Sequence, residues 1–316
     1  MAKSEKNQKN PSFVLWGKQI KDASGKRAVV SAIFYSFPSN QNAHGSGGTN
    51  IITQKIIPWG VEAEPRVYVS PYALKRRIRD YWIKKGLKVY LREDKELIEE
   101  IDKNGSIIDY IDNDLFGYMK AERGKSSDVR PGPITTWGAV SCEPIHPFID
   151  FNTNIISTKE SNTNIISTKE SEKGGSIINR SISKEFYFTS FFINPDIIGI
   201  DFLTGKNLEK EKKQERLKLF FEALDYAMQK DSGGARDRPA CVFKAIEITS
   251  GGYGKSDKQI FKSIKVKNDK VEIEKIPENV DIIHVDEKFV EIKDKYEVVN
   301  QIDKIIEYLI EKKTEK

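Results

Sequence analysis

The side chains best suited to chemistry in this chain are cations gathered at the start of one expected helix. Ser70 is a favourable N-cap, and Pro71 suits the first helical position, where its missing N–H costs nothing. Four cations follow within two turns: Lys75, Arg76, Arg77 and Arg79. Free backbone N–H groups at a helix N-terminus attract anions, and these cations strengthen that attraction. The pattern therefore predicts a site for phosphate groups.

The same expected helix also has an apolar face and admits a purely structural interpretation. Its apolar residues recur at a helical spacing that predicts burial: Leu74, Ile78, Tyr81 and Trp82. Arg76 and Asp80 are four residues apart and would suit an ordinary solvated ion pair. The surrounding cations favour a ligand instead, because Asp80 is the one acid between Arg66 and Arg92. We therefore expect a basic surface that binds a polyanion such as nucleic acid.

Composition limits the classes of protein and of ligand. The chain has 316 residues, with 52 Lys plus Arg against 47 Asp plus Glu, so its formal net charge is only +5. This charge does not indicate nucleic-acid binding by itself, and the clustering of the cations carries that inference. The two cysteines, Cys142 and Cys241, exclude a disulfide framework and favour a reducing compartment. No apolar run is long enough to span a bilayer and no secretory signal is present, so we expect a cytoplasmic protein without a membrane partner.

Three patterns permit an enzyme, and each has a simpler interpretation. Cys142 and His146 are close in sequence, but a catalytic thiol and its base are usually assembled across a fold. Residues 251–256 end like a phosphate-binding loop, yet Thr249 stands where the motif requires Gly, and no helix is expected after them. Asp22 lies in a Gly-containing turn, where an Asp most often serves as a cap. We expect no catalytic residue, metal or cofactor, since the three histidines lack metal-ligand spacing: His44, His146 and His284.

Five short segments between about residues 40 and 250 carry a resemblance to a known family. They are Ser70 with Leu74-Lys75-Arg76 and Arg79, the Asn- and Gly-rich loop 39–50 with Lys55 after it, and the segments 114–117, 130–133 and 233–238. Taken in chain order, they resemble the signature regions of the CRISPR-associated backbone subunits of the RAMP superfamily, which polymerise along guide RNA in Cascade complexes. Within that family the type I-B-like, DevR-like members are the most similar. The first strand region and the last sixty residues show no resemblance.

The resemblance implies an α+β fold, namely a modified ferredoxin-like (RRM-type) palm with a helical finger insertion and a β-hairpin thumb. Residues 1–12 are expected to be disordered and 13–316 to form a single domain, with the finger near 93–125 and the thumb near 146–185. The expected palm elements are strand 28–37, a helix from 70, strands 134–145 and 186–193, helix 208–229 and strand 240–248. Outside the palm we expect a strand at 13–20, a hairpin at 262–276 turning at Asn268-Asp269, and a helix at 296–312.

An identical duplication supports the expected thumb. The decamer at residues 152–161 recurs without a change at 162–171. Such a duplication is tolerated where the chain projects from the core, so we expect an extended hairpin arm at this position. The alternative interpretation is a loop without a function.

The resemblance also implies which residues contact RNA. Lys75, Arg76 and Arg79 are expected to hold phosphates, Ser70 to donate a hydrogen bond to one, and Tyr72 to stack on a base. The full set of expected RNA-binding residues is Asn42, His44, Lys55, Ser70, Tyr72, Lys75, Arg76, Arg79, Arg130, Gly233, Gly234, Arg236 and Arg238. Contacts with phosphates do not read sequence, which leaves the bases of a guide free to pair with a target.

The function implied is that of a repeated, filament-forming backbone subunit of a type I Cascade surveillance complex. Its partners would be CRISPR RNA, target DNA held by the guide, copies of the chain itself in a helical filament, and other Cascade subunits. Two alternatives remain open. One is a guide-directed RNA endonuclease of the type III kind, for which Asp22 is suitably placed, and the other is a solitary RRM-like RNA-binding protein.

Overall fold

The computed structural model describes most of the chain between residues 13 and 311. The parts described are residues 13–15, 18–20, 23–39, 54–56, 65–90, 106–120, 128–144, 148–155, 175–227, 240–299 and 301–311. Within these parts, no helix is both long and apolar enough to cross a membrane.

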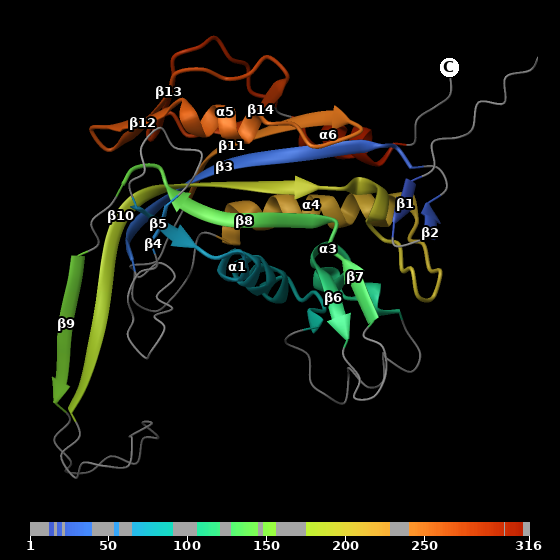
Figure 1. Ribbon diagram of the computed structural model, residues 1–316, viewed down its shortest axis with the longest axis horizontal. Helices are drawn as coiled ribbons and strands as arrows, with labels where there is room; N and C mark the ends of the chain where they lie inside the picture. Colours follow the sequence, from blue (N-terminus) through green and yellow to red (C-terminus); the bar gives the residue numbers. More distant parts are fainter. Residues whose placement is uncertain are drawn as a thin grey trace, which may run out of the picture.

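An eight-stranded antiparallel sheet forms the centre of the fold, in the order β14-β11-β3-β10-β8-β5-β4 with β9 paired to β10 (Figure 1). Its strands are β3 (Lys26–Ser39), β4 (Gln54–Ile56), β5 (Pro65–Val69), β8 (Ile134–Ser141), β9 (Phe148–Ile155), β10 (Gly175–Ile193), β11 (Ala240–Ser250) and β14 (Val280–Val285). With α1 (Pro71–Lys84) and α4 (Lys210–Ala227), the chain order β3-α1-β8-β10-α4-β11 and the sheet order β11-β3-β10-β8 are those of a ferredoxin-like fold. The predicted fold class is confirmed.

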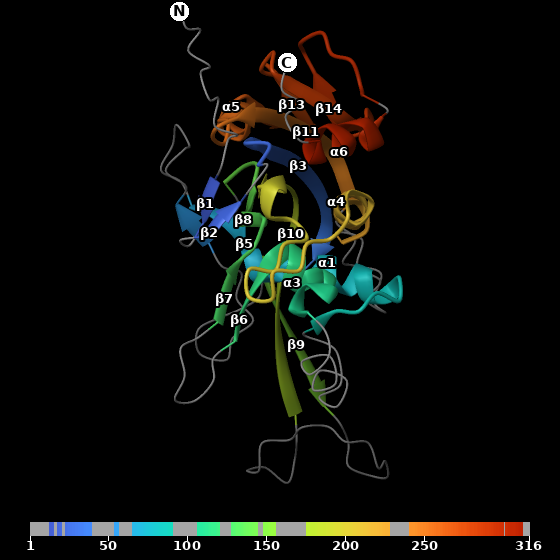
Figure 2. The same cartoon turned by 90° about the vertical axis from the view of Figure 1, so that its right-hand side faces the viewer.

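Both faces of the central strand β3 are buried, which explains its nearly continuous apolar sequence. Val30 and Phe34 point to the face that is covered by apolar side chains of α1, α4 and α6 (Ile302–Ile310). Ile33 lies on the opposite face, in a cluster with Phe261 of α5 (Ser256–Lys262). Figures 1 and 2 show α5 on the other side of the sheet from α1, so the sheet is the middle layer of the molecule.

The C-terminal residues build the layer that covers the second face. A three-stranded sheet there consists of β12 (Ile264–Lys267), β13 (Lys270–Ile273) and β15 (Val290–Ile292). Asn268 and Asp269 connect β12 and β13 with positive φ angles of 50° and 59°, as a type I′ hairpin turn requires. The predicted hairpin is confirmed. The predicted terminal helix is α6, which begins at Ile302 and not at 296, because Val298 pairs with Ile282 as an isolated β-bridge.

The segment expected to form the finger is described only in part. Residues 93–105 and 121–125 lie outside the described residues, so the finger stays a prediction. The described remainder contains the 3-10 helix η2 (Ile107–Asp109), the short helix α3 (Ile111–Phe116) and the strand β6 (Gly117–Lys120), which pairs with β7 (Asp128–Pro131). Because Ile111, Leu115 and Phe116 belong to the main apolar cluster, α3 is part of the palm core.

The predicted hairpin arm corresponds to β9 and the first part of β10. These strands pair from Phe148↔Ile182 to Ile155↔Gly175, and the ribbon extends away from the body of the molecule (Figure 1). Most of the duplicated decamer lies outside the described residues. The N-terminal strand expected at 13–20 is instead a hairpin of β1 (Phe13–Leu15) and β2 (Lys18–Ile20). The expectation of one continuous strand was wrong, because Phe13 pairs with Ile20 and Leu15 with Lys18 in antiparallel register.

Candidate nucleic-acid interface

Helix α1 begins as its sequence predicts. Strand β5 ends at Val69, and the Ser70 hydroxyl accepts a hydrogen bond from the N–H of Ala73 at 3.2 Å. Pro71 occupies the first helical position. The predicted apolar face is also confirmed, since Leu74, Ile78, Tyr81 and Trp82 are all buried. Trp82 in addition donates a hydrogen bond to the carbonyl of Leu219, which ties α1 to α4.

Tyr72 and Arg76 occupy the exposed side of α1. The Tyr72 side chain is 84 % exposed, which is more than any other large apolar or aromatic residue among the described ones. Arg76 forms an exposed pair with Asp80, with Nε and Oδ1 2.9 Å apart. Exposed pairs of this kind contribute only about 0.3–0.5 kcal/mol. Arg76 is therefore free to exchange Asp80 for a stronger anionic partner.

Lys75 is a partly buried cation with no counter-ion among the described residues. Its ammonium lies 5.1 Å from the centre of the Phe116 ring, and no described residue gives it a hydrogen bond or an ion pair. Burial, and secondarily repulsion by Arg79, lower the pKa of Lys75 to about 8. A half-buried cation without a counter-ion is unfavourable unless an anion binds beside it. We call Tyr72, Lys75 and Arg76 together the α1 surface.

Arg79 is held inside the protein. Its Nε donates a hydrogen bond to Oδ2 of Asp112 at 3.0 Å, and the Asp112 side chain is fully buried. The Arg79 guanidinium also lies 5.2 Å from the centre of the Phe116 ring. On the other side, Oδ1 of Asp112 accepts a hydrogen bond from the N–H of Tyr90 at 2.9 Å. These contacts join α1 to α3.

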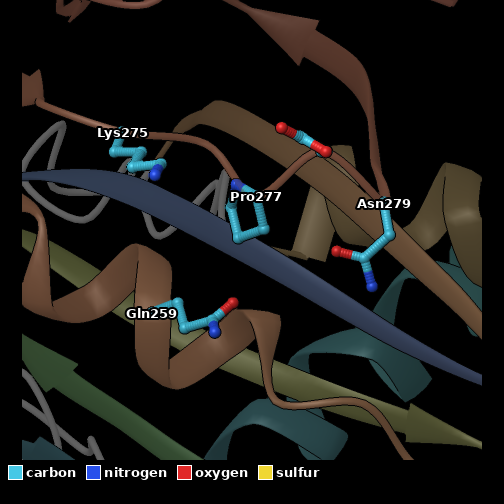
Figure 3. A pocket seen from close by; sticks show the side chains of 5 residues that line it. Gln259, Lys275, Pro277 and Asn279 are labelled. Atoms are coloured by element: carbon cyan, nitrogen blue, oxygen red, sulfur yellow. The ribbon is translucent and has the colours of Figure 1, made fainter.

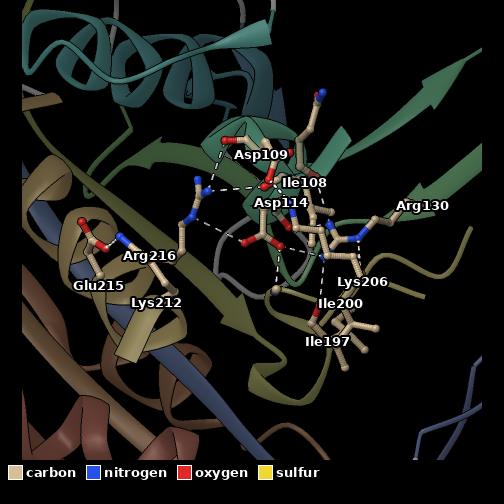
Figure 4. Close-up of polar contacts among 12 residues, drawn as sticks. Ile108, Asp109, Asp114, Arg130, Ile197, Ile200, Lys206, Lys212, Glu215 and Arg216 are labelled. Carbon is tan, nitrogen blue, oxygen red and sulfur yellow. Dashed lines mark hydrogen bonds and ion pairs between the residues drawn. The ribbon is translucent and has the colours of Figure 1, made fainter. Parts of the chain in front are cut away.

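Arg130 is also internal, in contrast to its expected place at the RNA. It is 3 % exposed, and its guanidinium is surrounded by oxygen atoms (Figure 4). Its acceptors are the carbonyls of Asn113, Asp114, Ile197 and Ile200 and the carboxylate of Asp114. These five contacts use all five N–H donors of an arginine. Because nothing remains to bind a phosphate, we leave Arg130 out of the proposed interface.

The other expected site residues are only partly placed. Lys55 lies in β4, opposite Arg66 of β5 in the register of the sheet. Arg66 donates a hydrogen bond to the carbonyl of Ser141 at 3.0 Å. The remaining residues of the expected set lie outside the described residues: Asn42, His44, Gly233, Gly234, Arg236 and Arg238. The structure thus brings Ser70, Tyr72, Lys75 and Arg76 together.

Sequence reasoning missed two residues of this region, Asp112 and Phe116. Phe116 was noted only as part of the motif at 114–117, and Asp112 was not singled out. Asp112 contacts Arg79 at a sequence separation of 33 residues, and no periodicity connects the two. One signal in the sequence points to Phe116, because a large aromatic residue at the end of a short acidic segment suggests a buried side chain.

The Gly-rich segment 251–256 is followed by a helix, α5, so the expectation that no helix follows was wrong. The helix start is nevertheless occupied from within, because Oε2 of the buried Glu247 accepts a hydrogen bond from the N–H of Ser256 at 3.0 Å. Oε1 of Glu247 accepts another from Asn279. A carboxylate therefore fills the place that a phosphate would need.

A hollow of about 570 Å³ lies beside α5 (Figure 3). It is lined by Gln259, Lys275, Pro277, Glu278 and Asn279. It lies on the opposite side of the sheet from α1 and adds nothing to the α1 surface. Among the described residues, no group of three or more His, Cys, Asp and Glu is arranged to hold a metal ion.

Comparison with known proteins identifies a family and a fold. The family profile of CRISPR-associated protein Cas7 matches residues 61–287. A solved chain described as "CRISPR RNA-guided surveillance complex, pre-nicking" is similar with a TM-score of 0.54 and 12 % identity, covering 90 % of this chain and 99 % of that one. A second, described as "CRISPR RNA-guided surveillance complex", has a TM-score of 0.40 and 13 % identity over 70 % of this chain and 68 % of that one, too low to support an argument. No curated protein matches the sequence significantly.

Proposed function

Because the chain belongs to the Cas7 family of CRISPR-associated proteins, we propose that it binds CRISPR RNA along the phosphate backbone through the α1 surface. The family expected from the sequence is confirmed. The subtype stays a prediction, and with it the assignment to a type I, I-B-like Cascade complex. The first solved chain supports the proposal through its fold, which it shares with this chain over nearly its whole length.

The observation that carries the proposal is the ammonium of Lys75, which has neither a hydrogen bond nor an ion pair with any residue that the structure describes. Burying a cation without a partner costs free energy, so a folded protein keeps such a group mainly where a ligand supplies the missing charge. Arg76 and the exposed Tyr72 lie on the same helix within one turn of Lys75, and Ser70 caps the start of this helix. Cations beside an exposed aromatic ring are the combination that single-stranded RNA requires, because the cations bind phosphates and the ring stacks on a base.

Binding through phosphates suits a protein that must hold guides of many sequences. Contacts with phosphates fix the position of the strand and carry no sequence information. We propose that the bases stay free to pair with target DNA, that copies of the chain repeat along one guide as a filament with other Cascade subunits, and that the complex works in the cytoplasm without cleaving the RNA. Guide RNA of uniform length that copurifies with the chain would separate this function from that of a solitary RNA-binding protein.

Replacing Lys75 with Ala is expected to weaken the binding of a single-stranded RNA about tenfold, which corresponds to the loss of one charge-assisted contact. The slope of log affinity against log salt concentration should fall by about 0.7, because one fewer phosphate is neutralised. Fluorescence anisotropy at several salt concentrations measures both quantities.

Full-length RNA should also be recovered after incubation of the wild-type complex with Mg²⁺ or Mn²⁺.

Lys262→Ala is the matched control for this experiment. Lys262 is an exposed lysine in the last turn of α5, on the opposite side of the sheet, and its replacement changes the net charge equally. It should leave both the affinity and the slope close to the wild-type values. Equal losses of affinity in the two variants would mean that RNA responds only to the net charge of the protein. This result would contradict the proposal that RNA binds at the α1 surface. RNA fragments that disappear in Asp22→Ala would favour the type III endonuclease.

The affinity for RNA is expected to fall as the pH rises above about 8. Burial and Arg79 hold the pKa of free Lys75 near this value, so the ammonium loses its proton there unless a phosphate is bound. Below pH 7 the free and bound proteins are both protonated, and the affinity should be constant. Between pH 8 and 9 it should decrease by up to tenfold per pH unit, since binding must then take up a proton. Lys75→Arg, which stays charged, should give a flat profile, and an equally steep one would exclude Lys75 as the titrating group.

A further inference from the structure

Arg79 and Lys75 share one aromatic platform but differ in what else they contact. Both cations lie over the ring of Phe116, at 5.2 and 5.1 Å from its centre. The Arg79 side chain is only 15 % exposed, and its Nε is bonded to the fully buried carboxylate of Asp112. Lys75 has no such partner among the described residues. The two cations, one helical turn apart, are therefore suited to different tasks.

We infer that Asp112 and Arg79 form a positioning pair, in which Asp112 fixes Arg79 against Phe116 and Arg79 holds Lys75 in place for an RNA phosphate without binding a phosphate itself. The inference rests on the proposed function of the α1 surface. Arg79 was expected to bind RNA directly, and the inference instead makes it a residue that positions an RNA-binding side chain.

The position of Arg79 argues against a phosphate bound to it. Its side chain is only 15 % exposed, and its Nε donates to a completely buried carboxylate, so a phosphate that drew the guanidinium outward would leave Asp112 as an uncompensated charge. Asp112 is itself held by the N–H of Tyr90. Two residues further on, Asp114 is bonded to Arg130 at 2.8 Å and to the N–H of Gly199 at 2.8 Å. The pair thus lies beside a buried, hydrogen-bonded part of the core.

Repulsion between neighbouring cations explains how Arg79 acts on Lys75. Two like charges over one ring keep apart, so a fixed Arg79 limits the positions that are open to the Lys75 ammonium. The other charged groups of α1 and α3 in this region are already engaged, Arg76 with Asp80 and Asp114 with Arg130. Arg79 is consequently the charge to which Lys75 responds.

The test compares Arg79→Gln and Asp112→Asn with Lys75→Gln, using the full chain and a single-stranded RNA of mixed sequence. Lys75→Gln should lower the slope of log affinity against log salt concentration, here called the salt slope, by about 0.7, the value for one lost phosphate contact. Arg79→Gln should weaken binding several-fold at pH 7 but leave the salt slope unchanged. It should also move the pH at which affinity begins to fall upward, because Lys75 no longer faces a second cation. A purely structural role would not move this pH.

The double variant Arg79→Gln/Asp112→Asn should bind RNA no more weakly than either single variant, because both substitutions break the same pair. Arg79→Lys, which keeps a charge within reach of Asp112, should restore part of the affinity and covers the case in which Arg79→Gln folds poorly. A salt slope that falls by about 0.7 in Arg79→Gln, or strictly additive losses in the double variant, would overturn the inference.

The same measurements separate the two proposals. If the slope falls in both Lys75→Gln and Arg79→Gln, the α1 surface binds RNA and only the positioning role of Arg79 is lost. If the wild-type chain shows no salt-dependent affinity for RNA, the proposed function fails, and the inference fails with it.

Discussion

Replacing Arg130 with Met is expected to destabilise the folded protein by about 3–5 kcal/mol. The substitution keeps roughly the length of the side chain but removes the five hydrogen bonds that Arg130 donates, one to the carboxylate of Asp114 and four to backbone carbonyls. Asp114 would be left in the core with Arg216 as its nearest cation, at 3.8 Å. In a chain of this size the loss corresponds to a decrease of roughly 5–8 °C in the melting temperature, measurable by calorimetry or circular dichroism.

Two controls make this result specific. Lys212→Met removes the exposed pair of Lys212 with Glu215, close to the same region, and should change the stability by less than about 0.5 kcal/mol (Figure 4). In the Arg130→Met background, Asp114→Asn should restore part of the loss because it removes the buried charge. A double variant that is less stable than Arg130→Met would show that the charge of Asp114 is satisfied without Arg130.

The cost of Arg130→Met should also depend on pH. Burial raises the pKa of Asp114, whereas Arg130 and Arg216 lower it. Without Arg130 the pKa of the folded state rises further above that of the unfolded state. A group with a raised pKa in the folded state loses stability as the pH rises through that pKa. The difference in stability between the variant and the wild type should therefore be larger at pH 8 than at pH 5.

Gly132→Ala is expected to destabilise the protein by about 3 kcal/mol, the upper end of the usual range for overpacking. A Cβ atom at Gly132 would lie 2.4 Å from the carbonyl carbon and oxygen of Phe116, and backbone atoms cannot move aside as a flexible side chain can. The comparison is Gly252→Ala, where a Cβ would meet nothing within 4 Å. Gly252→Ala should stay within about 0.5 kcal/mol of the wild type.

Chemical denaturation of both glycine variants measures these differences directly. Because the Phe116 ring supports Lys75, Gly132→Ala should also weaken RNA binding in the fraction of protein that remains folded. Equal stability of the two variants would mean that the β7–β8 connection can move away from α3 at little cost. It would also mean that the close approach at Gly132 does not fix Phe116.

The sequence predicts those features of the fold that depend on neighbouring residues. The start of α1 follows from Ser70 and Pro71, its buried face from a helical spacing, and the β12–β13 turn from Asn268-Asp269, because local backbone preferences decide each of them. The sequence does not predict which distant segments of the chain contact one another. An arginine before Pro-Gly is equally compatible with a surface contact and with burial, and only the approach of Asp114 and the residues near 197–200 makes Arg130 internal.

The same distinction between local and long-range features applies to the candidate site. Lys75, Arg76 and Tyr72 were found as residues of one helix, whereas the different environments of Lys75 and Arg79 depend on α3, which meets them through tertiary packing. The covering layer on the second face was recognised only as separate elements. Its helix α5 has seven residues, too few to show a clear period.

The hairpin arm is anchored in the central sheet, because the 19-residue strand β10 belongs to both. Its first part pairs with β9 and its second part lies between β3 and β8, with a register irregularity near Ser183 and Glu185 at the junction. The eight residue pairs of the hairpin give it a reach of roughly 25 Å. Because one continuous strand serves both, the palm sets the direction of the arm.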